Sequence, residues 1–152
     1  MPARLIDSPA GPLLLVEADG ALAEIRFADG TERDSDDTPL LRRAERQLAE
    51  FFAGRRRDFD LKLAPARTPF QQRVRDAMRR IPYGQTRSYG ELAHDAGGAP
   101  RAIGQACGAN PLPLVVPCHR VVGAAGPGGY SGGKGLETKQ FLLSLESRPG
   151  GG

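Results

Sequence analysis

The chain has 152 residues, of which 39% are hydrophobic and 26% are charged, and its formal net charge is +3. This composition is typical of a globular protein, and no stretch approaches the roughly 18 consecutive apolar residues that span a membrane. The N-terminus carries no signal segment, so we expect a cytoplasmic protein without a membrane partner. The two cysteines and two histidines match no zinc spacing, so we expect free thiols and no metal ion.

The two halves of the chain differ in charge. Residues 1–66 contain 10 Lys and Arg against 13 Asp and Glu, a net of −3, whereas residues 67–152 contain 11 against 5, a net of +6. We predict two domains with these bounds. The positive charge of the second domain favours a polyanionic partner, although surface lysines and arginines also serve solubility alone.

The first domain is predicted to be a small β-sheet with one helix. Two β-prone runs, 13–17 and 21–27, flank an Asp-Gly turn and indicate a β-hairpin. Thr38 followed by proline predicts the start of a helix that ends at Gly54. Apolar and polar residues alternate over 59–63, which predicts a further strand. Nothing in this domain indicates chemistry.

Three helices are predicted at the start of the second domain, over residues 69–81, 89–94 and 101–108. Thr68 and Ser88 each precede a Gln or Glu at the third following position, which is the pattern of a capping box. Two short helices joined by a glycine turn are typical of a helix-turn-helix. Many helical hairpins bind nothing, so this pattern alone does not establish DNA binding.

The third predicted helix is unusually slim. Ala102, Gly104, Ala106 and Gly108 leave one of its surfaces almost without side chains, behind the single arginine Arg101. Each glycine costs roughly 1 kcal/mol relative to alanine inside a helix, so the pattern indicates that another body approaches the backbone closely. That body is either a neighbouring helix or the floor of a DNA groove.

An apolar run over 112–116 is interpreted as a buried strand that presents Cys118 beside His119. A thiol needs a neighbouring base or cation to become a thiolate near neutral pH, and an adjacent imidazole is a common one. A free cysteine is also often a small buried core residue. The pair alone leaves both interpretations open.

Taken in order, these motifs resemble the O6-alkylguanine-DNA alkyltransferases, the methylated-DNA–protein-cysteine methyltransferases. The resemblance covers residues 68 to 146 and is carried by Thr68–Gln71, Ile81–Gly84, Ser88–Ala93, Arg101–Gly104, Asn110–Pro111, Pro117–Gly123, Tyr130–Gly133 and Leu136–Glu146. It implies an α+β fold, with a structural N-terminal lobe of β-sheet and one helix. The mainly helical C-terminal lobe would bind DNA and hold the reactive cysteine. The resemblance also implies a monomer without a cofactor.

The resemblance implies a DNA repair activity. The alkyl group of O6-alkylguanine, or of O4-alkylthymine as a second candidate, passes irreversibly from double-stranded DNA to Cys118 in a single turnover. The family pattern gives His119 the role of base, acting through a water molecule, and Glu146 the role of orienting the imidazole. Tyr89 and the region of Ser131 would supply hydrogen bonds to the leaving oxygen.

The family also binds the minor groove and flips the damaged base out of the duplex. By resemblance, Arg101 would fill the vacated stack, and Asn110 would join the strand before the cysteine to the recognition helix. The further DNA-binding residues would be Tyr89, Ala102, Gly104 and Arg120, and the substrate pocket would be lined by Val121, Tyr130 and Ser131.

The sequence departs from the family pattern in two places. The segment between Tyr89 and Arg101 is about two residues shorter, which alters the approach to the recognition helix. Lys134-Gly135 reads as an insertion after the Tyr130–Gly133 motif. Neither departure touches the Cys-His pair.

Three other functions fit parts of the sequence. A thiol hydrolase usually takes its base from a distant position, whereas His119 is adjacent, and consecutive residues on a strand face opposite sides. A DNA-binding module without repair activity would not need Cys118. The glycine-rich stretch 128–134 nearly matches a phosphate-binding loop, but Gly135 replaces the Ser or Thr that would bind magnesium.

Overall fold

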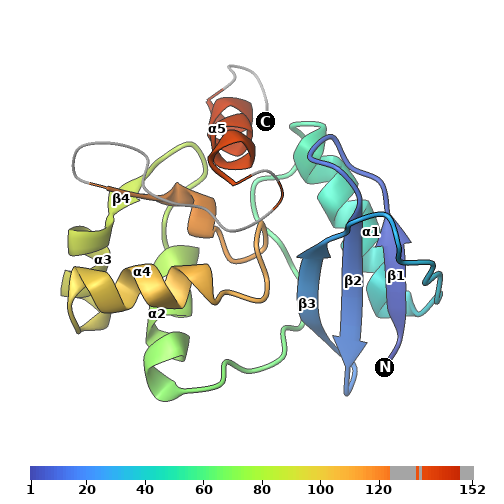
Figure 1. Ribbon diagram of the computed structural model, residues 1–152, viewed down its shortest axis with the longest axis horizontal. Helices are drawn as coiled ribbons and strands as arrows, with labels where there is room; N and C mark the ends of the chain where they lie inside the picture. Colours follow the sequence, from blue (N-terminus) through green and yellow to red (C-terminus); the bar gives the residue numbers. More distant parts are fainter. Residues whose placement is uncertain (124–132, 134, 148–152) are drawn as a thin grey trace. The chain divides into compact units, whose positions relative to one another are not determined.

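The structure is a computed structural model that describes residues 1–123, 133 and 135–147. The chain folds as two compact units, Met1–Ala64 and Pro65–Ser147, whose elements are drawn in Figure 1. The first unit is a sheet with one helix and the second is mainly helical, which confirms the predicted α+β class. No described helix is long and apolar enough to cross a membrane.

The first unit contains an antiparallel sheet in the order β1-β2-β3. Its strands are β1 (Ala3–Ile6), β2 (Leu13–Ala18) and β3 (Ala21–Phe27). The predicted hairpin joins β2 to β3, and its turn residues Asp19 and Gly20 both have positive φ, 51° and 75°. Asp-Gly is favoured in such turns because their backbone twist matches that of the flanking strands.

Helix α1 (Pro39–Phe52) packs against this sheet. As predicted, Thr38 caps the helix, because its hydroxyl accepts a hydrogen bond of 3.1 Å from the Leu41 amide. Gly54, with a φ of 77°, follows the helix end. The buried apolar side chains recur at helical spacing and form one face: Leu41, Ala44, Leu48, Phe51 and Phe52.

The predicted strand over 59–63 is wrong. This segment makes one isolated bridge, between Leu22 and Leu63. The side chain of Gln47 in α1 binds the backbone of Asp60 instead, accepting from its amide at 2.9 Å and donating to its carbonyl at 3.0 Å. Those backbone groups are the ones that a strand would need for its ladder.

The described α-helices of the second unit are α2 (Pro69–Arg79), α3 (Tyr89–Ala96), α4 (Pro100–Gly108) and α5 (Leu136–Glu146). The Thr68 hydroxyl caps α2, accepting from a first-turn amide at 3.0 Å. At α3, Ser88 and Glu91 exchange hydrogen bonds of 3.0 Å and 2.9 Å, which completes the predicted capping box. Gly97 and Gly98, both with positive φ, turn the chain between the packed helices α3 and α4.

The apolar run over 112–116 is buried as predicted, but it is a loop and not a strand. Prolines within and beside it have no amide hydrogen to donate to a ladder. The Asn110 side chain closes the loop, donating to the Val116 carbonyl and accepting from the Leu112 amide, both at 3.0 Å. The strand pair beside this loop is parallel and short, β4 (Arg87–Ser88) with β5 (Val121–Val122).

Candidate active site

Cys118 is the first residue of a single 3-10 turn, Cys118–Arg120, which follows the buried loop. The Cys118 amide donates to the Val116 carbonyl at 2.8 Å, and the Arg120 amide donates to the Pro117 carbonyl at 3.0 Å. Cys118 is 9% exposed and His119 is fully buried. Because the segment is a turn with three residues per revolution, the two side chains are not forced to opposite sides, as they would be on a strand.

Glu146, the last residue of α5, binds the two residues that follow the cysteine, His119 and Arg120. Its Oε2 lies 2.6 Å from His119 Nε2, and it accepts hydrogen bonds from Arg120 at 2.8 Å and 2.9 Å. The Gly84 amide donates to Glu146 Oε1 at 3.3 Å. The side chains of Glu146, His119 and Arg120 are all buried, and the carboxylate of Glu146 is paired with the guanidinium of Arg120.

The network fixes the protonation states of its members. Burial opposes ionisation of Glu146, but the hydrogen bonds from His119 and Arg120 outweigh it and lower the pKa of Glu146 to about 2. Burial also lowers the pKa of His119, against the opposite effect of Glu146, so the imidazole is neutral near pH 7. An ionised carboxylate only accepts hydrogen bonds, so Nε2 carries the proton and Nδ1 carries the lone pair.

Arg120, which the family pattern placed among the DNA contacts, is buried in this structure. It is 5% exposed, and besides binding Glu146 it donates to the Ile81 carbonyl at 2.8 Å. Its guanidinium carbon lies 5.6 Å from the Tyr83 ring centroid. These donors are directed into the protein, where Arg120 links the segment that follows α2 to α5.

A lysine that the sequence analysis did not single out lies beside the cysteine. Lys139 in α5 is fully buried, and its Nζ donates to the Val121 carbonyl at 2.6 Å and lies 5.9 Å from the Tyr89 ring centroid. Burial lowers the pKa of Lys139, and a negative charge on Cys118 or Cys107 raises it. The same attraction stabilises a thiolate at Cys118.

One signal in the sequence could have revealed this lysine. Lys139 precedes the buried Leu142 by three residues and the buried Glu146 by seven. That spacing places all three side chains on one face of a helix. A lysine on the face that is otherwise buried is unusual, since burial of an ammonium group is costly.

The second cysteine has a different environment. Burial raises the pKa of Cys107 to about 12, and its Sγ lies 3.7 Å from Met78 Sδ. Cys107 is therefore a protonated thiol near neutral pH. Such a thiol is a poor nucleophile.

The slim face of α4 is not required by the packing of the described residues. Arg101 is exposed, and Ala102 and Gly104 are half-buried. A Cβ added at Gly104 would lie 3.9 Å from the Tyr89 ring, an ordinary contact, and one at Gly108 would meet nothing within 4 Å. The sequence left two explanations for these glycines, a neighbouring helix or the floor of a DNA groove. Because the described helices leave room for a Cβ at both positions, the structure favours a body outside the protein.

The described residues do not include every residue of the predicted site. Tyr130 and Ser131 of the substrate pocket, and Lys134 of the insertion, lie outside the described residues. Val121 is fully buried, and its carbonyl is the acceptor for Lys139. Within the described part of the chain, no group of three or more His, Cys, Asp or Glu side chains is placed to hold a metal ion.

The sequence matches two domain families over most of its length. Residues 69–148 match the family described as "6-O-methylguanine DNA methyltransferase, DNA binding domain". Residues 1–65 match "6-O-methylguanine DNA methyltransferase, ribonuclease-like domain". The chain belongs to the 6-O-methylguanine DNA methyltransferase family. The resemblance predicted from the motifs is thereby confirmed.

Curated relatives of this methyltransferase are similar over nearly their whole length. The methylated-DNA–protein-cysteine methyltransferase of Methanosarcina acetivorans is 44% identical over 151 residues, which cover 93% of this chain and 96% of the relative. The protein of the same name from Mycobacterium tuberculosis is 46% identical over 151 residues, which cover 94% of this chain and 90% of the relative. The enzyme class that the motifs implied is confirmed by these relatives.

Solved structures of the family have the same fold. The crystal structure of Mycobacterium tuberculosis OGT in complex with DNA has a TM-score of 0.86 at 46% identity, and the match covers 97% of this chain and 93% of that one. O6-methylguanine-DNA methyltransferase from Pyrococcus kodakaraensis has a TM-score of 0.61 at 25% identity, with 96% and 98% covered.

Proposed function

We propose that this protein repairs DNA by transferring an alkyl group from O6 of guanine to Sγ of Cys118. The observation that carries the proposal is the turn that places Cys118 next to a buried imidazole, which Glu146 holds at 2.6 Å. Relatives named for methyl transfer from methylated DNA to a protein cysteine support the reaction class. A relative in complex with DNA supports the partner.

The first step is loss of the thiol proton. Neutral His119 takes up this proton at Nδ1 through one water molecule, and Glu146 stabilises the imidazolium that forms. The buried ammonium group of Lys139 stabilises the thiolate of Cys118. Together these groups replace the hydration that a thiolate would have in water.

The second step is a displacement at the alkyl carbon. The bond from Sγ to carbon forms as the bond from carbon to O6 breaks, and the electron pair stays with the guanine. Tyr89 and Ser131 are the proposed hydrogen-bond donors for this developing charge, and guanine gains one proton for the one that the thiol lost. A thioether is a poor leaving group, so each protein molecule reacts once. O4-alkylthymine contains the same kind of carbon–oxygen bond and is a second proposed substrate.

Access to O6 requires that the base leave the duplex. The exposed face of α4 would enter the minor groove, which is only about 6 Å wide, and the small residues Ala102 and Gly104 would let the helix approach its floor. Arg101 at the exposed start of α4 would fill the vacated stack. Val121 and Tyr130 are the proposed lining of the pocket for the flipped base.

Mass spectrometry of the intact protein tests this proposal. After incubation with a duplex containing O6-methylguanine, we expect a stoichiometric gain of roughly 14 Da, one CH2, on Cys118, as expected for alkylation of a thiol. Cys118→Ser should abolish the adduct, and the matched variant Cys107→Ser should retain it. Tight binding of the lesion without an adduct would indicate a DNA-binding module. Repeated cleavage of a peptide or ester would indicate a thiol hydrolase.

A further inference from the structure

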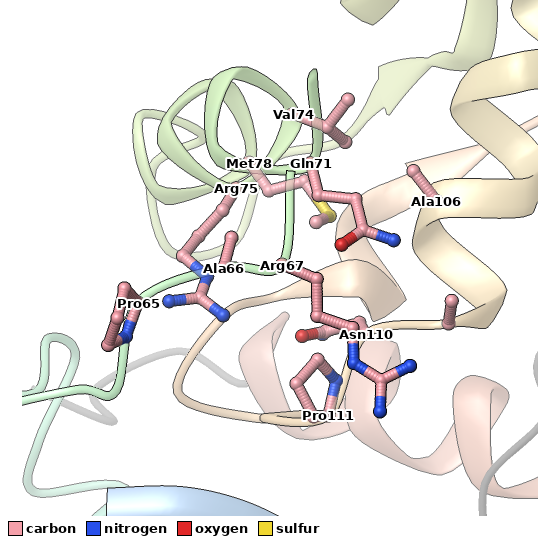
Figure 2. Close-up of a pocket in the computed structure, with 11 residues that line it drawn as sticks. Pro65, Ala66, Arg67, Gln71, Val74, Arg75, Met78, Ala106, Asn110 and Pro111 are labelled. Carbon is pink, nitrogen blue, oxygen red and sulfur yellow. The ribbon is translucent and has the colours of Figure 1, made fainter. Parts of the chain in front are cut away.

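The second unit contains a cavity of about 240 Å³ beside α4 (Figure 2). Its walls are the segment 65–67, one face of α2, and the C-terminal end of α4 with the three residues that follow. Polar side chains of Arg67, Gln71, Arg75 and Asn110 line it. Among the described residues that line the cavity there are two positive charges, on Arg67 and Arg75, and no carboxylate.

Arg75 makes the inner wall of the cavity basic. It is 6% exposed, and burial together with the positive charge of Arg79 lowers the pKa of Arg75, against a smaller opposite effect of Asp76. Arginine stays charged in proteins, so a buried guanidinium remains in a place with little hydration. Arg75 therefore adds a positive charge to the wall of the cavity.

Arg67 is exposed, but hydrogen bonds fix the backbone on both sides of it. The Ala66 amide donates to the Gln72 side chain at 3.3 Å, and Thr68 caps α2 with a hydrogen bond of 3.0 Å. The backbone is therefore anchored on both sides of Arg67. An anchored backbone lowers the entropy cost of fixing the guanidinium on a ligand.

The position of the cavity on α4 suggests which anion it receives. With 3.6 residues per turn, Ala106 and Ala109, which line the cavity, lie on the flank of α4 opposite Gly104. Gly104 faces the Tyr89 ring at 3.9 Å. A minor groove that admits the exposed face of α4 therefore has one sugar-phosphate strand on the Tyr89 flank and the other on the cavity flank.

We propose that this cavity binds a backbone phosphate of the DNA strand that runs along the α4 flank opposite Tyr89. Arg67 and Gln71 contact the phosphate, and Arg75 supplies charge from behind. The inference rests on the proposed function, because it requires a duplex bound at α4. Asn110 also lines the cavity while its amide closes the loop before Cys118, so the phosphate site borders the element that presents the nucleophile.

Salt dependence of duplex binding tests the phosphate site. Affinity for an unmodified duplex would be measured by fluorescence anisotropy across a NaCl series. Since each phosphate contact contributes about 0.9 to the slope of log K against log salt, we expect Arg67→Ala to reduce the slope by about 1. Affinity at fixed salt should fall by roughly three- to tenfold. Arg80→Ala is the matched control, because Arg80 is exposed in the same unit and does not line the cavity.

Three outcomes would overturn the inference. The first is an unchanged slope in Arg67→Ala, and the second is an equal loss in Arg67→Ala and Arg80→Ala. The third is that inorganic phosphate stabilises the folded protein only when Arg67 is present, while the salt slope of duplex binding does not depend on Arg67. That result would indicate a site for free anions. Failure of the wild-type protein to form any Cys118 adduct would count against the proposed function, and the slopes would still decide the phosphate site.

Discussion

Glu146 and His119 lie 27 residues apart in the chain and are joined by a buried hydrogen bond of 2.6 Å. The same carboxylate binds the Arg120 guanidinium, so its charge is matched even when the imidazole is neutral. The resting state is therefore an ionised Glu146 and a neutral His119, which is the state that a general base requires.

Replacement of Glu146 by glutamine keeps the shape of the side chain and removes its charge. We expect the single-turnover rate of alkyl transfer to fall by about 100-fold, at the lower end of the contribution of a positioned general base. The rate would be measured on a duplex containing O6-methylguanine, at a temperature where circular dichroism shows a folded variant. Glu137→Gln, on an exposed position of the same helix, should react at the wild-type rate. Equal rates for the two variants would contradict the role of Glu146.

Stability should depend on pH through this network. The folded-state pKa of Glu146, about 2, lies below its ordinary value of 4.5. The unfolded state therefore binds more protons between these values, so the stabilisation is present above pH 4.5 and is lost as the pH falls toward 2. A shift of this size corresponds to on the order of 3 kcal/mol. The lowered pKa of His119 acts in the same direction below its ordinary value of 6.5.

Thermal unfolding between pH 7 and pH 3 measures this effect. The melting temperature of the wild-type protein should fall through the acid range. The difference between wild type and Glu146→Gln should shrink as the pH falls below 4.5, because the unfolded wild-type chain then binds a proton at Glu146 that the folded chain, with a pKa of about 2, does not bind. A constant difference across the whole range would show that the charge of Glu146 does not stabilise the fold.

The parts of the fold that the sequence predicted are those that depend on neighbouring residues. The helix starts at Thr38, Thr68 and Ser88 are set by a side-chain oxygen and an amide three residues later. The hairpin turn depends on two adjacent residues that tolerate positive φ. Such patterns can be recognised in a short stretch of sequence, because the groups that form them lie within a few residues of one another.

The sequence did not predict features that depend on distant contacts. The apolar run before Cys118 has the composition of a buried strand, but no neighbouring strand pairs with it, and Asn110 closes it as a loop. Lys139 approaches the cysteines because α5 packs on the Cys118–Arg120 turn. Arg120 reads as a surface charge until its partner Glu146 is placed beside it. Contacts between residues that lie far apart in the chain cannot be predicted from the spacing of neighbouring residues.

Replacement of Lys139 by methionine tests whether its charge activates Cys118. Methionine fills a similar volume without an ammonium group, so we expect the fold to persist. The rate of Cys118 alkylation by iodoacetamide should reach its maximum about one pH unit higher than in wild type, because the thiolate loses a favourable charge. Both proteins would carry Cys107→Ser, which leaves one reactive thiol. An unchanged pH profile would limit Lys139 to a structural role through its hydrogen bond to Val121.

Arg101 provides a test of base flipping. Because Arg101 is exposed, its replacement by alanine should change stability by no more than about 0.5 kcal/mol. Repair of O6-methylguanine in a duplex should slow by about tenfold or more, whereas reaction with free O6-benzylguanine, which needs no flipping, should be unaffected. Arg80→Ala controls for the loss of one positive charge. Equal losses on both substrates would count against the stack-filling role.

Replacement of Gly104 by alanine tests whether this glycine serves the packing of α4 or its approach to DNA. In Gly104→Ala the new methyl group would make an ordinary contact with the Tyr89 ring at 3.9 Å, and alanine is favoured over glycine inside a helix by roughly 1 kcal/mol. We therefore expect a higher melting temperature. The same methyl group would widen α4 on its Tyr89 flank, which one DNA strand would face, so duplex repair should slow by about tenfold, a loss of about 1.4 kcal/mol, while free O6-benzylguanine reacts normally. A lower melting temperature with equal losses on both substrates would show that the glycine serves the packing of α4 and not its approach to DNA.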